Sequence, residues 1–443
     1  MLKQRLLFLV KSIYFQYFFF GFIGGLIFPP LYLVFLLPIS LNFILKNLQT
    51  TNFKTATLYS FGFFLPQLYW IAFSLLTDGK FMWLFPLAVC LVPLLSSFFV
   101  SIPIILTKKL QISGRFLVSL VFCFLFVVFE WLRGFILPWN FISYSLAFSD
   151  TLIQIANFLN IYVFDFIVLN FACILFVCDF KKFNKILFYY IGILFFILSF
   201  GIIRLHNVTP IKINKKIRIV QANIKQDLKW NQQEAYNNLK KYIDLSIGDD
   251  DIVIWSESSF PFSITSDTTL SGDFEKIKDK ILITGANRTN HKGKFWNTIF
   301  MFENLRVADF YDKNKLVPFG EFMPIPFLNT LTGFGNFSRG NGVRTITVDD
   351  NFKFSPIICF EIAFKKVINK KDLPNVIINL TNDAWFGNTS GPYQHLVAAK
   401  FRAVENNIPI IRVANTGISA YINEYGIVEK QIKLNEEGII LLE

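Results

Sequence analysis

The stretch that decides the fold of the C-terminal half is SPIICFEIAF, residues 355–364. It is an apolar run that ends at Cys359, with Glu361 two residues later, and such a run is typical of a buried strand that stops at a thiol. Upstream, Glu257 in DIVIWSESSF and Lys313 in YDKNKLVPFGEF also follow β-like runs. A thiol, a carboxylate and an ammonium at the ends of such runs indicate one converging site.

The composition excludes an ordinary soluble enzyme. Hydrophobic residues make up 53% of the 443 residues, charged residues only 17%, and 55 residues are phenylalanine. Because the apolar excess is confined to the first half, we predict a transmembrane domain at residues 1–204 and a globular domain at 215–443. Many basic residues of the +12 net charge lie in short loops between apolar blocks, which indicates membrane topology and no nucleic-acid partner.

Hydropathy predicts about seven membrane spans, each near the ~20 residues that a bilayer needs. The start MLKQRLLFLVK is interrupted by Lys11 and no small-residue cleavage site follows it, so we expect it to be retained. The predicted spans are Ser12 to Phe28, Leu31 to Leu45, Thr55 to Leu76, Phe81 to Leu106, Phe116 to Leu137, Ala156 to Cys178, and Ile186 to Arg204.

The basic loops predict the orientation of these spans. Four groups fall on one side of the membrane, which by the positive-inside rule is the cytoplasm. An odd number of spans then places everything after Arg204 outside, in the periplasm or its equivalent. The groups are Lys3, Arg5 and Lys11; Lys46 and Lys54; Lys108, Lys109 and Arg115; and Lys181, Lys182 and Lys185.

Charged residues inside the predicted spans are few. Glu130 and Arg133 lie three residues apart in EWLR, which places them on one helical face, and Asp165 is a second acid. Glu130 and Arg133 either neutralise each other's charge and so fix helix packing, or they contact a lipid headgroup or support catalysis.

The globular half predicts an α/β domain, because short β-rich runs alternate with helix-like segments. We expect a mixed or largely antiparallel sheet. The apolar segment Phe322 to Gly340 is expected to meet lipid or to cover the site, the alternative being an irregular piece of core. The predicted strands are IRIVQANI, DIVIWSES, ILITGANR, NTIFMF, RVADFYDK, VRTITVD, FSPIICFEI, NVIINLTND, IPIIRVANT and SAYINEYG, and the predicted helices are Gln232 to Ile247 and Tyr393 to Asn406.

Nucleophilic catalysis would give each polar residue of the site a role. Lys313 can stabilise a Cys359 thiolate, Glu257 can remove the thiol proton, and the Phe360 backbone N–H can bind a developing oxyanion. Taken alone, Cys359 is also compatible with a buried structural cysteine, Glu257 with a strand-end carboxylate and Lys313 with a solvated charge. Similarly, Glu321 and Glu361 are either hydrogen-bond supports or surface acids.

The remaining cysteines and the histidines argue against a metal site. Cys90, Cys123, Cys173 and Cys178 fall in apolar blocks, where thiols act as small hydrophobes. The three histidines are scattered, and neither CxxC nor HExxH occurs, so we expect no metal.

Several longer sequence motifs are more specific than the spacing of single polar residues. WSESSFP, YDKNKLVPFGEFMP, ICFEI, NLTNDAWFGNTSGPYQH and RAVENNIPIIRVANTGISA resemble the nitrilase superfamily, and the multi-span front with EWLR narrows the resemblance to the apolipoprotein N-acyltransferase family. The resemblance implies an αββα sandwich and a catalytic triad of Glu257, Lys313 and Cys359. It also implies support from Glu321 and Glu361, substrate-binding roles for Trp230 and Asn297, and no cofactor.

The implied reaction is a ping-pong acyl transfer. Cys359 takes the acyl chain from the sn-1 ester of a phospholipid, with phosphatidylethanolamine the expected donor, as a thioester. The α-amine of the diacylglyceryl cysteine of an apolipoprotein then accepts it, as the last step of lipoprotein maturation. We expect a monomer. The alternatives are a membrane-tethered amidase that hydrolyses small amides, and a transporter with an inactive outer domain.

Three features depart from the family pattern. Phe360 follows the nucleophile where tyrosine is common, and EWLR continues as FILPWN where relatives have a glycine-containing turn. The family usually has a further transmembrane helix after the catalytic domain, whereas the sequence ends at LNEEGIILLE. Either the front helices alone hold the protein in the membrane, or the sequence is a shortened one.

Overall fold

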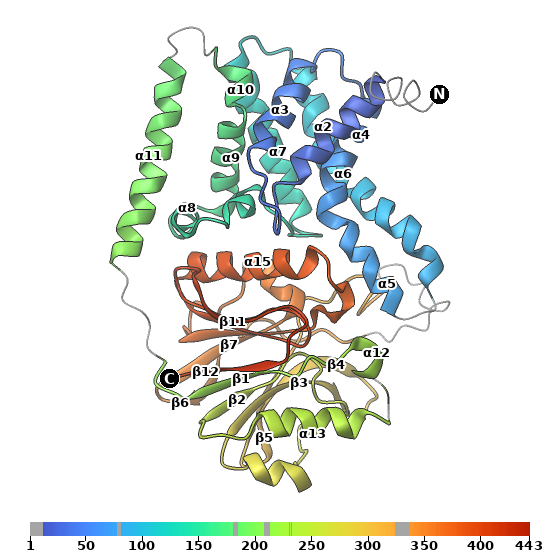
Figure 1. Cartoon of the computed structure of the whole chain (residues 1–443), viewed down its shortest axis with the longest axis vertical. Coiled ribbons are helices and arrows are strands. Elements are labelled where there is room, and N and C mark those ends of the chain that lie inside the picture. Colours follow the sequence, from blue (N-terminus) through green and yellow to red (C-terminus); the bar gives the residue numbers. More distant parts are fainter. Residues whose placement is uncertain are drawn as a thin grey trace. The chain divides into compact units, whose positions relative to one another are not determined.

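The computed structural model describes residues 12–77, 81–179, 185–207, 213–229, 231, 233–323 and 337–443. The chain forms two compact units (Figure 1). Unit 1 comprises Met1–Val208 with Thr389–Phe401, and unit 2 comprises Thr209–Asn388 with Arg402–Glu443. The helix α15 (Gly391–Asn406) therefore contributes most of its length to unit 1.

Each predicted apolar block of unit 1 contains a helix. Four of the described helical segments are long and apolar enough to cross a membrane: Phe53–Thr77, Met82–Lys109, Arg115–Arg133 and Lys185–His206. Three apolar helices are shorter, so the number of spans stays a prediction. The main helices are α2 (Ile13–Gly25), α3 (Leu36–Lys46), α4 (Phe53–Leu68), α6 (Phe85–Lys109), α7 (Arg115–Arg133), α9 (Ile161–Ala172) and α11 (Lys185–His206).

Short helical pieces connect these helices. They are η1 (Tyr69–Phe73), α5 (Ser74–Thr77), η2 (Met82–Leu84), η3 (Ile142–Leu146), α8 (Asp150–Ile153), η4 (Gln154–Asn157) and α10 (Ile174–Val177). The sixth predicted block is thereby divided, because α9 ends at Ala172 and α10 begins at Ile174.

Glycines set the approach of α2 to α4. A Cβ on Gly21 would lie 1.9 Å from the Tyr59 carbonyl oxygen, and one on Gly62 would lie 2.3 Å from the Phe18 carbonyl oxygen. In lipid there is no hydrophobic force that drives helices together, so they associate through close packing. Small residues allow the two helix backbones to approach closely enough for this packing. These positions therefore require glycine.

The charged pair at the end of α7 has a packing role. Arg133 and Glu130 are both buried and form an ion pair of 3.4 Å. The Arg133 guanidinium also donates to the carbonyls of Leu137 and Trp139, which fixes the loop that follows α7. These contacts favour the packing hypothesis for this pair.

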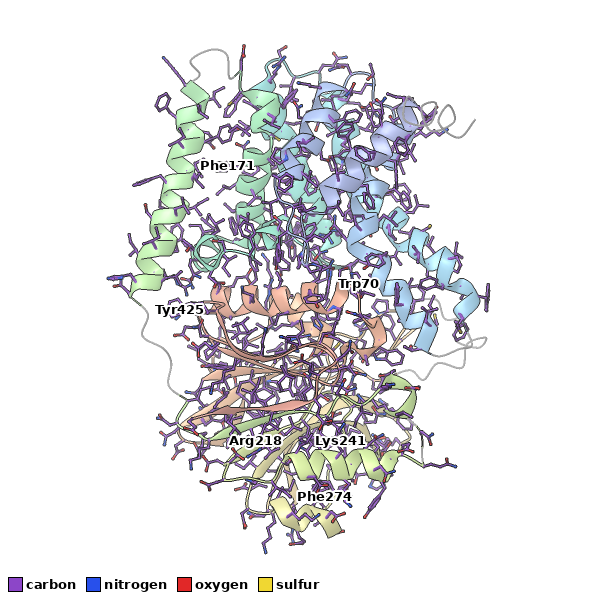
Figure 2. The ribbon with its side chains drawn as sticks, in the orientation of Figure 1. Trp70, Phe171, Arg218, Lys241, Phe274 and Tyr425 are labelled. Atoms are coloured by element: carbon purple, nitrogen blue, oxygen red, sulfur yellow. The ribbon has the colours of Figure 1, made fainter. Side chains whose placement is uncertain are left out.

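The start of α15 is fixed within unit 1 by two indoles. Trp70 (Figure 2) and Trp139 each donate to the Gln394 side-chain oxygen at 2.9 Å. Gly391 lies so close to the Trp70 ring that a Cβ there would be 2.7 Å from it. Trp139 of the FILPWN loop is therefore held at two points. Its backbone carbonyl accepts a hydrogen bond from Arg133, and its indole N–H donates one to Gln394.

Unit 2 contains two mixed sheets, each six-stranded among the described residues. The first has the order β12-β1-β2-β3-β4-β5 and the second β11-β10-β9-β8-β7-β6. The β1–β2–β3 and β7–β8–β9 neighbours are parallel and the other pairs are antiparallel. The bounds are β1 (Ile217–Gln221), β2 (Ile252–Ile254), β3 (Ile281–Thr289), β4 (Phe295–Glu303), β5 (Arg306–Asp312), β6 (Ile346–Asp349), β7 (Phe352–Ile358), β8 (Val376–Thr381), β9 (Ile410–Ala414), β10 (Ser419–Ile422), β11 (Val428–Ile432) and β12 (Gly438–Leu442).

The main core of unit 2 joins side chains of both sheets, such as Ile254 of the first and Ile378 of the second. A second cluster covers the outer face of the first sheet, where α13 (Ala235–Leu245) packs with Phe274 (Figure 2) from η5 (Gly272–Ile277). The predicted α/β layering with mixed strand pairing is therefore confirmed. The remaining short helices are α12 (Gln226–Lys229), η6 (Cys359–Ala363) and η7 (Asp383–Phe386).

Candidate active site

Three strand ends bring the predicted residues into one buried site. Glu257 lies in the turn after β2, Lys313 directly follows β5, and Cys359 directly follows β7. The Lys313 Nζ atom is 3.6 Å from Glu257 Oε1, and the charges of both residues act on the Cys359 thiol. The exposed fraction of each of the three residues is 9% or less.

The backbone at this site takes sparsely populated conformations. Cys359 has a φ of +50° and Ser258, next to Glu257, has a φ of +48°. Such conformations cost energy in non-glycine residues and persist where the surroundings enforce them. Gly285 of β3 helps to do so, since a Cβ there would lie 2.5 Å from the Ser258 nitrogen. The turn that carries Glu257 can therefore lie directly against β3.

The two carboxylate oxygens of Glu257 have different surroundings. Oε1 accepts a hydrogen bond of 2.7 Å from Asn297 Nδ2 and is the oxygen nearest Lys313. Oε2 is buried and has no hydrogen-bond partner among the residues that the structure describes. One oxygen is thus held in place while the other remains able to accept a proton.

Lys313 is held as an ammonium by two acids. Its Nζ donates to Glu321 Oε1 at 2.8 Å, in addition to the contact with Glu257. Burial alone would lower the pKa of Lys313, but the Glu321 and Glu257 carboxylates outweigh it and the pKa is raised. Asn297 Nδ2 also donates to Glu321, at 2.9 Å, so it ties the two carboxylates together. Its predicted contact with substrate stays a prediction.

The Cys359 sulfur is a thiol in this resting arrangement. Burial, and then the Glu257 charge, raise its pKa to about 12, while Lys313 acts in the opposite direction. A thiolate is the stronger nucleophile, so attack by this sulfur requires a base to take the proton as the new bond forms.

Glu361 connects the Cys359 turn to the Lys313 segment. Its carboxylate accepts hydrogen bonds from the Ile358, Asn314 and Lys315 backbone N–H groups and from the Tyr311 hydroxyl. Burial raises the pKa of Glu361 and these backbone donors lower it. The residue is a structural support of the site and not a surface acid. Phe360 stacks edge-on against Phe364, with 5.3 Å between ring centroids.

A second buried network also acts on Cys359, and the sequence reasoning gave it no role. Arg412 of β9 donates to Asp383 at 2.6 Å and to Asn379 at 2.9 Å. Thr381 hydrogen-bonds to Cys359 and lies 3.4 Å from Asp383. The available signal was the NDAWFG motif, which contains Asp383.

Part of the predicted site lies outside the described residues. This applies to Trp230 and to residues 324–336 of the apolar segment. The described end of that segment runs beside the site, since the Phe337 N–H donates to the Glu321 carbonyl and the Gly340 N–H to the Lys313 carbonyl.

Comparison with known proteins agrees with this architecture. Residues 20–174 match the model of the apolipoprotein N-acyltransferase N-terminal domain, and residues 216–443 match that of the carbon-nitrogen hydrolases. The chain is 36% identical to apolipoprotein N-acyltransferase of Rickettsia bellii, over 95% of this chain and 89% of that protein. It is 33% identical to that of Rickettsia prowazekii over the same shares, and 31% identical to that of Rhodopseudomonas palustris over 86% and 78%.

Proposed function

The chain belongs to the apolipoprotein N-acyltransferase family, and from this premise we propose how its buried residues transfer an acyl group. It is a membrane acyltransferase of lipoprotein biosynthesis with a nitrilase-like domain. Family membership favours this activity over the amidase and transporter hypotheses.

The first half-reaction forms a thioester. Glu257 Oε2 accepts the thiol proton while Cys359 Sγ forms a bond to the ester carbonyl carbon of a phospholipid. The carbonyl electron pair moves to oxygen, where the Lys313 ammonium and the Phe360 backbone N–H stabilise the oxyanion. The C–O bond then breaks, and Glu257 returns the proton to the departing alkoxide, which leaves as a lysophospholipid.

The second half-reaction forms the amide. The neutral α-amine of the diacylglyceryl cysteine attacks the thioester carbonyl, and Glu257 takes a proton from the attacking nitrogen. When the C–S bond breaks, the sulfur leaves as a thiolate and receives that proton. The free enzyme is restored, and the lipoprotein carries a third acyl chain.

The contrast between the two Glu257 oxygens carries this proposal. Asn297 and Lys313 hold Oε1, whereas Oε2 has no partner among the described residues. A carboxylate held at one oxygen and open at the other suits a base that must accept and return one proton twice in each cycle. The raised pKa of Cys359 supports the same assignment, because the thiol needs such a base.

Location and substrates complete the proposal. We assign the catalytic part to residues 215–443, on the periplasmic side of the inner membrane, and the membrane part to residues 1–204. The donor is a phospholipid, with phosphatidylethanolamine the first choice, and the protein acts as a monomer. Both substrates are anchored in lipid, so a membrane-held enzyme can meet an ester and an anchored amine at the same depth.

The test is acyl transfer from phosphatidylethanolamine vesicles to a synthetic diacylglyceryl lipopeptide. Cys359→Ala should abolish formation of the N-acylated peptide, whereas Cys90→Ala should retain it, because Cys90 is an exposed cysteine of α6. Undiminished transfer by Cys359→Ala would reject the assignment of the nucleophile. Release of free fatty acid by the wild type without N-acylation would favour the hydrolase.

A further inference from the structure

A second lysine is buried beside the proposed base. Lys229 is the last residue of α12, and its exposed fraction is 5%. Its Nζ atom donates to the backbone carbonyl of Glu257 at 2.8 Å. The titratable groups that act on it are the Glu257 carboxylate and the Cys359 thiol. Among the described residues, no carboxylate lies within 4.0 Å of the Lys229 Nζ atom. Lys229 therefore contacts the Glu257 backbone directly and interacts with the Glu257 carboxylate only at longer range.

Among the described residues, the other charged groups of the site have close partners, and the carboxylates of Glu257 and Glu321 share one ammonium group. Lys313 alone contacts both Glu257 and Glu321. Asp383 is paired with Arg412 at 2.6 Å, and Glu361 is satisfied by backbone donors. With Lys229 included, two ammonium groups balance the carboxylates of Glu257 and Glu321.

We propose that Lys229 is a positioning residue of the acyl-transfer site, which fixes the Glu257 backbone and supplies the second positive charge felt by Cys359. The proposal rests on the role of Glu257 as the base in the proposed function. Through Glu257, Lys229 keeps the open Oε2 oxygen in place, and through its charge it favours the thiolate that forms during attack.

Burial of this lysine is costly, which argues against a filler role. Burial lowers the pKa of Lys229 to about 8, while Glu257 and Cys359 act to raise it. A buried ammonium that lacks a close carboxylate destabilises a fold, and such groups cluster at functional sites. Because the folded-state pKa is lowered, the positive charge is present below about pH 8 and is lost as the pH rises above it.

The test is the pH profile of Cys359 alkylation by iodoacetamide, measured on the Cys359 peptide by mass spectrometry. In Lys229→Met, the rate at neutral pH should fall about tenfold, since the cation that favours the thiolate is gone. Above about pH 8 the difference from the wild type should shrink, because Lys229 loses its charge there. The matched control is Lys225→Met, which removes the exposed lysine directly before α12. It should leave the profile unchanged.

Two further measurements decide the matter if Lys229→Met fails to fold. Lys229→Arg keeps its charge at all relevant pH values, so it should react faster than the wild type between about pH 8 and 10. In the wild type itself, the rise in rate should slacken above about pH 8, where Lys229 loses its charge.

The proposal is overturned if Lys229→Met matches Lys225→Met, if Lys229→Arg matches the wild type up to about pH 10, or if the wild-type slope is uniform. Alkylation needs no lipid substrate. A failure of acyl transfer would therefore reject the proposed function without changing this profile, and the two failures can be told apart.

Discussion

At the scale of single residues, the site separates proton transfer from charge stabilisation. Glu257 raises the pKa of the Cys359 thiol, so this carboxylate disfavours a standing thiolate even though it is placed to remove the proton. Lys313 acts in the opposite direction on the same sulfur. In the proposed mechanism, Cys359 therefore stays a thiol until an ester carbonyl is in place, which would limit its side reactions.

This arrangement makes an unusual prediction for Glu257→Gln. Acyl transfer should fall by about 10²–10⁴-fold, because the base is lost. Alkylation of Cys359 by iodoacetamide at neutral pH should become faster, because the charge that raises the thiol pKa is also lost.

The two rates are measured on the same preparation, with Glu275→Gln as the control, since Glu275 is an exposed acid of η5. A Glu257→Gln variant in which both rates fall together would contradict the electrostatic account of this site.

Sequence reasoning could find the residues that directly follow a recognisable strand. Lys313 and Cys359 stand at such positions, Glu257 lies in the turn just after β2, and side chains at neighbouring strand ends meet in space. Lys229 and Arg412 could not be found this way. A lysine or arginine is normally a surface residue, and only the tertiary structure buries these two.

At the scale of helices and strands, the predicted runs include the central strands and the edge strands β5 and β6, but they miss the edge strands β11 and β12. β11 and β12 were not predicted. β11 reads VEKQI and is largely exposed at the edge of its sheet, so its polar pattern resembles a loop. β12 pairs with β1, more than two hundred residues earlier, and such long-range pairing leaves no local signal.

Some predicted blocks of unit 1 extend beyond their helices, whereas others fall short: the block Ile186 to Arg204 is shorter than α11 (Lys185–His206). Hydropathy reports where a chain is apolar, whereas a helix ends where its backbone geometry changes. The fifth predicted block extends to Leu137, but α7 ends at Arg133, whose side chain binds the carbonyls of the following loop. The apolar residues after Arg133 therefore belong to the loop that carries Trp139.

The α2–α4 contact gives a prediction with a matched control. Gly62→Ala should lower the thermal unfolding midpoint in detergent by several degrees, because its Cβ would lie 2.3 Å from the Phe18 carbonyl oxygen and the helices must separate. Gly192→Ala in α11 has no atom within 4 Å of its new Cβ and should be neutral or slightly stabilising. Equal midpoints for the two variants would show that the close approach is not required.

At the scale of the whole molecule, the distribution of basic residues predicts how the chain is oriented in the membrane. Lys46 ends α3, Lys108 and Lys109 end α6, and Arg115 begins α7. If these ends are cytoplasmic, the segment after α11 lies on the opposite side, together with the nitrilase-like unit.

This orientation is tested with cysteines added one at a time to a Cys90→Ala background, in which the remaining native cysteines are buried. A membrane-impermeant maleimide, applied to cells with a permeabilised outer membrane, should label Lys240→Cys in unit 2 and should not label Lys109→Cys at the end of α6. Both positions are exposed. The reverse pattern would place the nitrilase-like unit in the cytoplasm and contradict the proposed location.

The most direct test of the central claim, that Cys359 carries the acyl chain, is the mass of its peptide. After incubation of the purified protein with phosphatidylethanolamine and no acceptor, the Cys359 peptide should gain the mass of one acyl group, and hydroxylamine or the lipopeptide amine should remove it. An unmodified Cys359 peptide from a preparation that still N-acylates the lipopeptide would contradict the account.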